Sequence, residues 1–218
     1  MIRQLLLIPL LLFCGCSSSD RELYTPLPPT AGPRLTAPRI TKAYIPYGRK
    51  RPRSMSPRYI TIHSTQNTDF GAGARAHAKL LLHGALKGSH NSLGYVTWHY
   101  TVDDHSIYQS LPDHEQGQHA DYEGPGNRYS IGIEMCENRD NSRSRTIDQT
   151  ARLTASLMAK HNIPLRRIVP HYHWKRIRYD DRKNMGQKGC PHFLLDNGKP
   201  GRTWKSFLQK VRQYRAQY

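Results

Sequence analysis

The chain has 218 residues, and 37% of them are hydrophobic, which suits one domain of ordinary size with extensions. It carries 33 Lys and Arg against 16 Asp and Glu, a net charge of +17, which favours an anionic partner such as nucleic acid, anionic lipid or an anionic polymer. The basic residues are scattered and form no compact nucleic-acid motif, so we expect no nucleic-acid partner.

The N-terminus has the pattern of an export signal. Arg3 precedes an apolar run, residues 5–13, that is too short to cross a membrane. Gly15 and Cys16 then resemble the cleavage site of a bacterial lipoprotein, in which a small residue precedes the cysteine that carries the lipid. We predict a signal peptide over residues 1–15, a lipid on Cys16, and a lipid-anchored protein of the cell envelope that lies in the periplasm, on the outer membrane if the cell is Gram-negative. Plain secretion is the alternative.

Residues 16–57 are rich in proline, serine and arginine. Proline at this density opposes helices and sheet ladders. We therefore predict an extended, mobile tether over residues 16–57 and one folded domain over residues 58–218.

The folded domain is predicted to begin with a strand and a helix. In residues 58–63, Ile60 and Ile62 form an apolar face and His63 lies on the polar face. Residues 70–83 have a helical pattern.

A hairpin and a further strand follow. Residues 95–102 alternate in polarity, and residues 107–111 return after a turn. Residues 129–135 form another strand, in which Glu134 is a carboxylate among apolar residues. A charge there is costly unless it faces a polar cleft.

Two more helices are predicted, over residues 146–161 and 203–215, separated by a short strand at 167–171. Thr146 and Gln149 fit a capping box at the start of the first. Strands mixed with helices predict an α/β (α+β) single domain with a central mixed β-sheet flanked by helices.

Histidine and cysteine mark a candidate zinc site. His63 ends a strand, and His171, His173 and Cys190 lie close together near the C-terminus. Two histidines and one cysteine are a zinc-binding set that leaves a fourth position for water. The pattern alone leaves both His171 and His173 open as the second histidine.

A zinc hydrolase also needs a proton-handling group and a positive group for the charge that develops on the attacked oxygen. Glu134 and Lys188 are the candidates. The competing interpretation is a Cys136–Cys190 disulfide, since an exported protein with two cysteines invites one. That bond would remove the metal-binding thiolate.

Six segments carry a family resemblance. They are Tyr59-Ile-Thr-Ile-His63, Trp98-His-Tyr-Thr-Val-Asp-Asp104, Gln118-His-Ala120, Ser130-Ile-Gly-Ile-Glu134, Val169-Pro-His171 and Lys188-Gly-Cys-Pro191. In this order they resemble the zinc-dependent N-acetylmuramoyl-L-alanine amidases, a family that includes T7-type lysozyme, AmpD-type amidases and peptidoglycan-recognition proteins.

The resemblance implies that one zinc ion per chain is bound by His63, His171 and Cys190. It also implies that Glu134 handles the proton and that Lys188 polarises the carbonyl. The residues implied in substrate binding are His119, Trp98 and His99.

The implied reaction cleaves the amide between the lactyl group of N-acetylmuramic acid and L-alanine. The implied partners are peptidoglycan or muropeptides, with the protein a monomer held at the membrane through Cys16. A non-catalytic peptidoglycan-binding module of the same fold is the alternative function.

Overall fold

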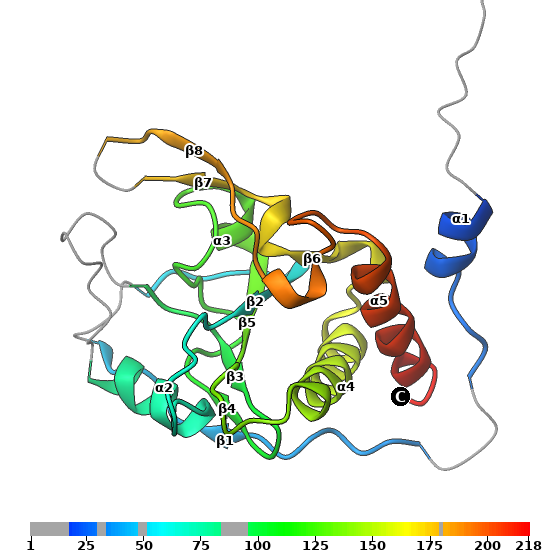
Figure 1. Cartoon of the computed structure of the whole chain (residues 1–218), viewed down its shortest axis with the longest axis horizontal. Helices are drawn as coiled ribbons and strands as arrows, with labels where there is room; N and C mark the ends of the chain where they lie inside the picture. Colours follow the sequence, from blue (N-terminus) through cyan, green and yellow to red (C-terminus); the bar gives the residue numbers. More distant parts are fainter. Residues whose placement is uncertain (1–17, 30–33, 48–51, 84–95, 179–180) are drawn as a thin grey trace, which may run out of the picture.

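The computed structural model describes residues 18–29, 34–47, 52–83, 96–178 and 181–218 (Figure 1). The helices are α1 (Ser18–Tyr24), α2 (Ala74–Leu82), α3 (Pro125–Tyr129), α4 (Arg143–His161) and α5 (Arg202–Arg215), with short 3-10 turns η2 (Leu165–Arg167), η3 (His171–His173) and η4 (His192–Leu194). The strands are β1 (Thr41–Lys42), β2 (Tyr59–Ser64), β3 (Tyr100–Val102), β4 (Ile107–Gln109), β5 (Ser130–Met135), β6 (Ile168–Pro170), β7 (Lys175–Ile177) and β8 (Asn184–Gln187). None of the helices in these ranges is long and apolar enough to span a membrane.

Six strands form one mixed sheet in the order β1-β4-β3-β5-β2-β6. β3 and β4 are antiparallel, and the other neighbours are parallel. This confirms the predicted central mixed sheet with flanking helices. The hairpin is shorter than predicted, because Thr97 forms an isolated bridge with Gln118 before β3 begins. Residue 95 lies outside the described residues.

The two faces of the sheet are covered by different helices. α4 and α5 lie side by side on one face, and α2 lies by β3 and β4 (Figure 1). Ile60 and Ile62 of β2 join the main core, which also contains apolar residues of α4 and α5. Thr61 and His63 alternate with them and therefore occupy the other face of β2, although both are also buried.

The start of α4 corrects one prediction. The helix begins at Arg143 rather than Thr146, and its N-cap Ser142 makes no side-chain cap hydrogen bond. Thr146 lies one turn inside the helix, where its Oγ1 donates to Ser142 O at 3.1 Å. The capping box was therefore wrong: Thr146 bonds back to the preceding turn, and Gln149 Nε2 donates to Asp103 O instead.

Parts of the predicted tether pack against the domain. β1 pairs with β4 at the edge of the sheet, and Ile45 is buried with Trp98 and Leu111. Leu23 of α1 joins the main core, although α1 lies beyond α5 in Figure 1. The described residues of this segment are therefore not all free of the domain, as an extended tether would require. Residues 1–17, which include the predicted signal peptide and Cys16, lie outside the described residues.

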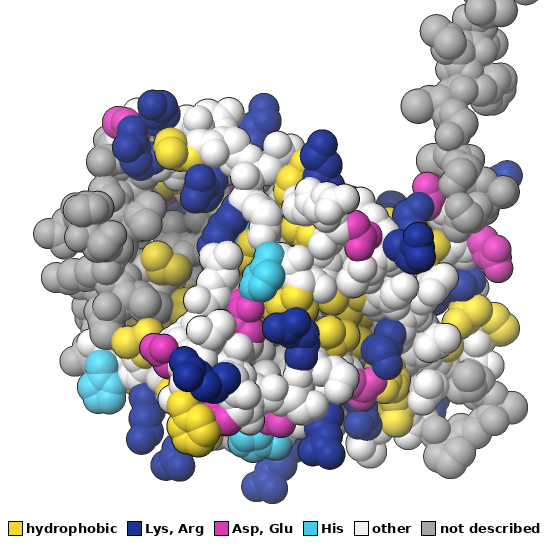
Figure 2. Space-filling model, viewed as in Figure 1, with side chains coloured by type: hydrophobic (Ala, Val, Ile, Leu, Met, Phe, Trp, Pro, Cys, Tyr) yellow, Lys and Arg dark blue, Asp and Glu magenta, His cyan; other side chains and the backbone are white. Residues whose placement is uncertain are grey.

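Positive charge is spread over the molecule. Figure 2 shows Lys and Arg side chains distributed across the visible face rather than gathered into one patch. This agrees with the scattered basic residues of the sequence and gives no sign of a nucleic-acid binding stripe on that face.

Candidate metal centre and cleft

Parallel pairing brings the candidate residues to one edge of the sheet. His63 lies directly opposite Glu134 in the β2–β5 pair. Ile62 lies opposite Pro170 in the β2–β6 pair, so His171 begins the turn just beyond the end of β6. The carboxyl ends of β5, β2 and β6 therefore place three polar side chains together, although they lie far apart in the sequence.

A buried group of two nitrogens and one sulfur occupies this edge. The ligand atoms of His63, His171 and Cys190 all lie within 4.8 Å of one another. The two Nδ1 atoms of the histidines are 3.0 Å apart. Burial lowers the pKa of His63 well below its ordinary value and that of His171 to about 3, so both rings are neutral and offer lone pairs.

His119 and Ser130 fix which nitrogen of His63 faces this group. The Nε2 of His119 lies 3.2 Å from the carbonyl oxygen of Ser130, which can only accept, so His119 Nε2 carries the proton. Burial keeps His119 neutral, and its Nδ1 must then accept the bond from His63 Nε2 at 3.0 Å. This assignment follows from the hydrogen-bond network and leaves the Nδ1 lone pair of His63 free to bind a metal.

Hydrogen bonds hold the other two members in place. Trp174 Nε1 donates to Thr61 Oγ1 at 2.9 Å, which ties the turn that carries His171 to β2. The backbone N–H of Tyr172 donates to the carbonyl of Cys190 at 3.2 Å. The backbone N–H of Ser64 donates to the Cys190 sulfur at 3.3 Å. A donor to sulfur favours the thiolate, against the burial that raises the pKa of Cys190 to about 12.

The structure does not agree with two alternatives that the sequence left open, His173 as a metal ligand and a Cys136–Cys190 disulfide. His173 is exposed and packs edge-to-face against Trp174, with ring centroids 4.5 Å apart, so it is outside the buried group. Cys136 and Cys190 are both free thiols, so no disulfide joins them. Cys136 is fully buried, and its sulfur lies 4.0 Å from His77 Nδ1.

Glu134 lies beside the buried group with one oxygen unpaired. Its Oε1 is 3.8 Å from His63 Nδ1, and its Oε2 is buried without a hydrogen-bond partner among the described residues. Burial raises the pKa of Glu134 to about 7, and the positive charge of Lys188 opposes this effect. A carboxyl group with such a pKa exchanges a proton readily near neutral pH.

A cleft of about 230 Å³ opens next to His171. Lys188 and His119 line it together with Arg176 and Ile177 of β7. The hairpin β7–β8, which the sequence did not predict, therefore forms one wall, and the hairpin projects from the domain (Figure 1). The full lining is Val96, Gln118, His119, Ala120, Tyr122, Asn127, His171, Arg176, Ile177 and Lys188.

Two residues expected to bind substrate are instead part of the interior. His99 is fully buried; its Nδ1 accepts from Gly132 N and its Nε2 donates to Glu115 O. Trp98 is 5% exposed, and its Nε1 donates to Thr101. The ring nitrogens of His99 and the indole N–H of Trp98 are therefore already bonded, and neither residue lines the cleft.

Sequence reasoning missed the residues that position His119. Asn127 Oδ1 accepts from the backbone N–H groups of His119 and Ala120, and Asp121 accepts from Gly126 and Asn127 at the start of α3. The available signal was Pro125, because proline is favoured at the first position of a helix, with acidic residues in the loop before it.

The donor set fits a zinc ion. Zinc is bound by histidine nitrogen and cysteine sulfur at about 2.0–2.3 Å, which places two ligands of a tetrahedron roughly 3–4 Å apart. The spacing of His63, His171 and Cys190 is close to this, and three protein ligands leave one position open.

The sequence matches known proteins. Residues 53–193 match the family described as N-acetylmuramoyl-L-alanine amidase. The amidases XlyA and CwlH of Bacillus subtilis strain 168 are 43% and 42% identical to this chain, over 171 and 176 residues. These matches cover 77% and 79% of this chain, but the chain spans only 49% of XlyA and 60% of CwlH.

Solved structures give the same result. The catalytic domain of XlyA is 41% identical, with a TM-score of 0.65, over 79% of this chain and 99% of that structure. PlyL is 29% identical, with a TM-score of 0.60, over 79% of this chain and 96% of that structure. The fold is thus the one that the resemblance implied, and the chain belongs to the N-acetylmuramoyl-L-alanine amidase family.

Proposed function

We propose that this chain is a peptidoglycan hydrolase. It cleaves the amide between the lactyl group of N-acetylmuramic acid and L-alanine of the stem peptide. Membership of the amidase family supports this reaction. So does the arrangement of neutral histidines, a thiol and a carboxyl group at one edge of the sheet, next to a cleft that is lined by His171 and the ammonium group of Lys188.

His63, His171 and Cys190 hold one zinc ion in this proposal. Their neutral rings, their spacing and the backbone donor to the Cys190 sulfur support the assignment. When bound, zinc acts as a Lewis acid on the carbonyl oxygen and lowers the pKa of a water towards about 7.

Glu134 takes the proton of the attacking water and returns it to the leaving amine of L-alanine. A pKa of about 7 and an unpaired buried oxygen suit both steps. Lys188 lines the same cleft and supplies positive charge for the oxygen of the tetrahedral intermediate. His119 orients His63 through their hydrogen bond and also lines the cleft.

The observation that carries the proposal is the unpaired Glu134 carboxylate beside three metal-binding atoms. Glu134→Gln keeps the shape of the side chain and removes its basic oxygen. We expect this variant to keep its zinc and to lose about 100-fold or more of its activity. Zinc content and muropeptide release from purified peptidoglycan measure the two properties.

Two further variants make this test decisive. Cys190→Ser should lose both zinc and activity, whereas Glu123→Gln, a surface change at an ion pair with Arg53, should lose neither. Full activity in Glu134→Gln would remove Glu134 from the mechanism. A wild-type protein that binds peptidoglycan but releases no muropeptide would support the non-catalytic binding module instead.

The protein acts in the cell envelope as a monomer anchored by a lipid on Cys16. The apolar run before Gly15-Cys16 supports export and lipid attachment. Radiolabelled palmitate should enter the full-length protein in cells and be absent from Cys16→Ala. Labelling of the Cys16→Ala protein at the wild-type level would reject Cys16 as the lipid attachment residue.

A further inference from the structure

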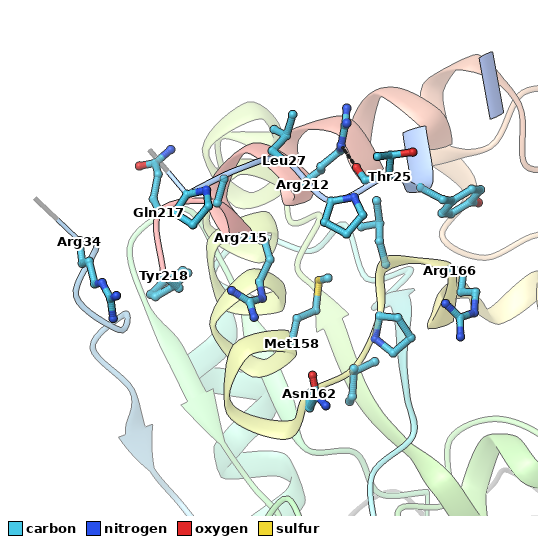
Figure 3. A pocket seen from close by; sticks show the side chains of 17 residues that line it. Thr25, Leu27, Arg34, Met158, Asn162, Arg166, Arg212, Arg215, Gln217 and Tyr218 are labelled. Atoms are coloured by element: carbon cyan, nitrogen blue, oxygen red, sulfur yellow. Dashed lines mark hydrogen bonds between the residues drawn. The ribbon is translucent and has the colours of Figure 1, made fainter. Parts of the chain in front are cut away.

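A second cavity of about 550 Å³ lies at the C-terminal ends of α4 and α5 (Figure 3) and shares no lining residue with the cleft. The N-terminal segment crosses over these helix ends and closes one side of the cavity. Arg212 Nε donates to Thr25 O at 2.7 Å, and Leu35 N donates to Gln217 O at 2.9 Å. The volume is within the range of about 300–1000 Å³ that is usual for small-molecule pockets.

One part of the cavity wall is apolar. Its lining includes Leu27, Met158, Ile163 and Leu165, together with several prolines. Leu27 is 36% exposed, although it is a large hydrophobic residue, and Figure 3 shows it above the cavity, opposite Met158. An apolar surface of this kind suits a ligand with an aliphatic chain better than a ligand that is polar throughout.

Four arginines surround the apolar walls. Arg34 and Arg166 lie at opposite ends of the group in Figure 3, with Arg212 and Arg215 between them. The lining contains no aspartate or glutamate, and none of the four arginines forms an ion pair within the described ranges. Arg212 already donates to Thr25 O, but no carboxylate side chain lines the cavity to neutralise the four guanidinium groups. Such groups favour an anion, especially a phosphate or carboxylate that can accept two parallel hydrogen bonds.

We infer that this cavity binds a lipid with an anionic headgroup. The acyl part would lie against Leu27, Met158 and Leu165, and Arg166 and Arg215 would hold the acidic group. A free phosphate would leave the apolar walls uncovered, and a neutral lipid would leave the arginines unpaired. The four arginines therefore require an anionic group in the ligand, and the apolar lining requires acyl chains.

The position of the cavity agrees with this ligand. Tyr24 and Thr25, at the end of α1, line the cavity, and α1 begins two residues after Cys16. A lipid held here would keep α4 and α5 close to a membrane surface. The inference does not depend on the amidase reaction, because no residue of the cavity lines the catalytic cleft.

The test uses the protein from residue 18 and short-chain lipids below their micelle concentration, with binding followed by calorimetry. We expect dihexanoyl phosphatidylglycerol to bind at least tenfold more tightly than dihexanoyl phosphatidylcholine. Glycerol phosphate, which has the anionic group without the chains, should bind at least tenfold more weakly than the anionic lipid. Equal binding of the two lipids, or equal binding of glycerol phosphate, would overturn the inference.

Variants then locate the site. Arg166→Gln with Arg215→Gln removes two positive charges from the cavity and no described hydrogen bond, and should weaken the anionic lipid at least tenfold. Arg75→Gln with Lys79→Gln removes two exposed charges from α2, on the opposite side of the molecule (Figure 1), and should leave binding unchanged. An equal loss in both double variants would mean that net charge alone attracts the lipid, which rejects the cavity.

Leu27→Asp tests the apolar wall separately. The side chain is partly exposed, so its replacement spares the core, and the new carboxylate would lie where the acyl part is expected. Loss of binding with an unchanged unfolding temperature supports the site. Full binding in this variant would show that the lipid does not enter the cavity.

Discussion

Two consecutive hydrogen bonds, from His63 to His119 and from His119 to the carbonyl of Ser130, fix the orientation of the His63 ring. Ser130 O accepts from His119, and His119 accepts from His63, so the Nδ1 lone pair of His63 is left for the group that it forms with His171 and Cys190. Gly132 makes room for this arrangement, because a Cβ at that position would lie 2.9 Å from the ring carbons of His119. The glycine of the Ser-Ile-Gly-Ile-Glu segment thus leaves space for the His119 ring and has no direct role in binding the metal.

The role of His119 as a hydrogen-bond acceptor can be tested with two replacements, one that keeps the bond from His63 and one that removes it. In His119→Asn, the amide oxygen takes the place of Nδ1 and still accepts from His63. In His119→Gln, the longer amide reaches towards Ser130 O but leaves the N–H of His63 without its acceptor. We expect zinc affinity close to wild type for the asparagine variant and a loss of about 10–100-fold for the glutamine variant. Competition with a chromophoric chelator measures both.

The metal-free unfolding temperature of each His119 variant serves as the control. If both variants lose the same affinity, His119 matters for packing and not for the orientation of His63. If neither loses affinity, the hydrogen bond from His63 contributes nothing to metal binding.

The residues of the metal centre could be predicted from the sequence, but the orientation of their side chains could not. His63, His171 and Cys190 stand out because few side chains bind zinc and because each lies in a segment that resembles the amidases. The sequence does not say which way a ring points: His119 lines the cleft and also bonds His63, whereas His99, which was also expected to bind substrate, lies in the interior. Their roles depend on hydrogen bonds to backbone groups of β5 and its neighbours, which the sequence alone does not specify.

At the scale of elements, Asp113 joins two strands to α4. Tyr100 of β3 and Gln109 of β4 donate to its Oδ1, and Lys160 and His161 at the end of α4 contact its Oδ2 at 2.8 and 2.7 Å. Burial raises the pKa of Asp113, but the hydrogen bonds from His161, Lys160 and Tyr100 outweigh burial and hold it well below the ordinary value.

Asp113→Asn should therefore lower the free energy of unfolding by about 2–3 kcal/mol at pH 7, since hydrogen bonds to a charged group are lost. A carboxylate with a lowered folded-state pKa stabilises the fold above its unfolded pKa of about 3.9 and loses this effect as pH falls below it. The difference between wild type and variant should thus be full at pH 6–7 and should narrow below about pH 4. Urea unfolding across this pH range measures it.

Asp148 is the matched control for Asp113. It also bonds a lysine and a tyrosine, Lys210 and Tyr214, but it is 35% exposed. Asp148→Asn should cost less than about 1 kcal/mol, because a surface ion pair contributes little. Equal losses at the two positions would mean that burial of Asp113 does not strengthen its bonds.

The longer helices and strands could be predicted from the spacing of their apolar residues, and the short ones could not. β2 and β5 were predicted because their residues alternate and are apolar, and α5 because its apolar residues recur at helical spacing. α3 has five residues, too few to show a period, and the exposed hairpin β7–β8 has no apolar face. The capping box at Thr146 failed because α4 begins one turn earlier, where Ser142 N donates to Asp104 Oδ2. The Thr146 hydroxyl donates to Asn141 Oδ1 and to Ser142 O from inside the helix.

At the scale of the whole molecule, residues before 58 complete the sheet. β1 adds an edge strand to β4, and Ala43 N and Ile45 N donate to Gln109 O and Ser110 O at 2.8 and 3.0 Å. Ile45 and Met55 are 3% and 7% exposed, although both precede the predicted start of the domain. Proline-rich composition predicted a tether here, but two buried side chains and an edge strand tie it to the domain.

A chain shortened to residues 58–218 should therefore be less stable than residues 18–218. Loss of the buried Ile45 and Met55 alone removes about 3–6 kcal/mol at 1.5–3 kcal/mol for each side chain. In a protein of this size each kcal/mol shifts the unfolding temperature by about 2–4 °C, so we expect a drop of at least about 6 °C with zinc present. A third chain, residues 38–218, keeps β1, Ile45 and Met55 but lacks α1, and most of the drop should occur between it and residues 58–218. Equal unfolding temperatures for 18–218 and 58–218 would mean that the segment docks on the domain without belonging to its cooperative unit, and the tether as first predicted would then be the better description.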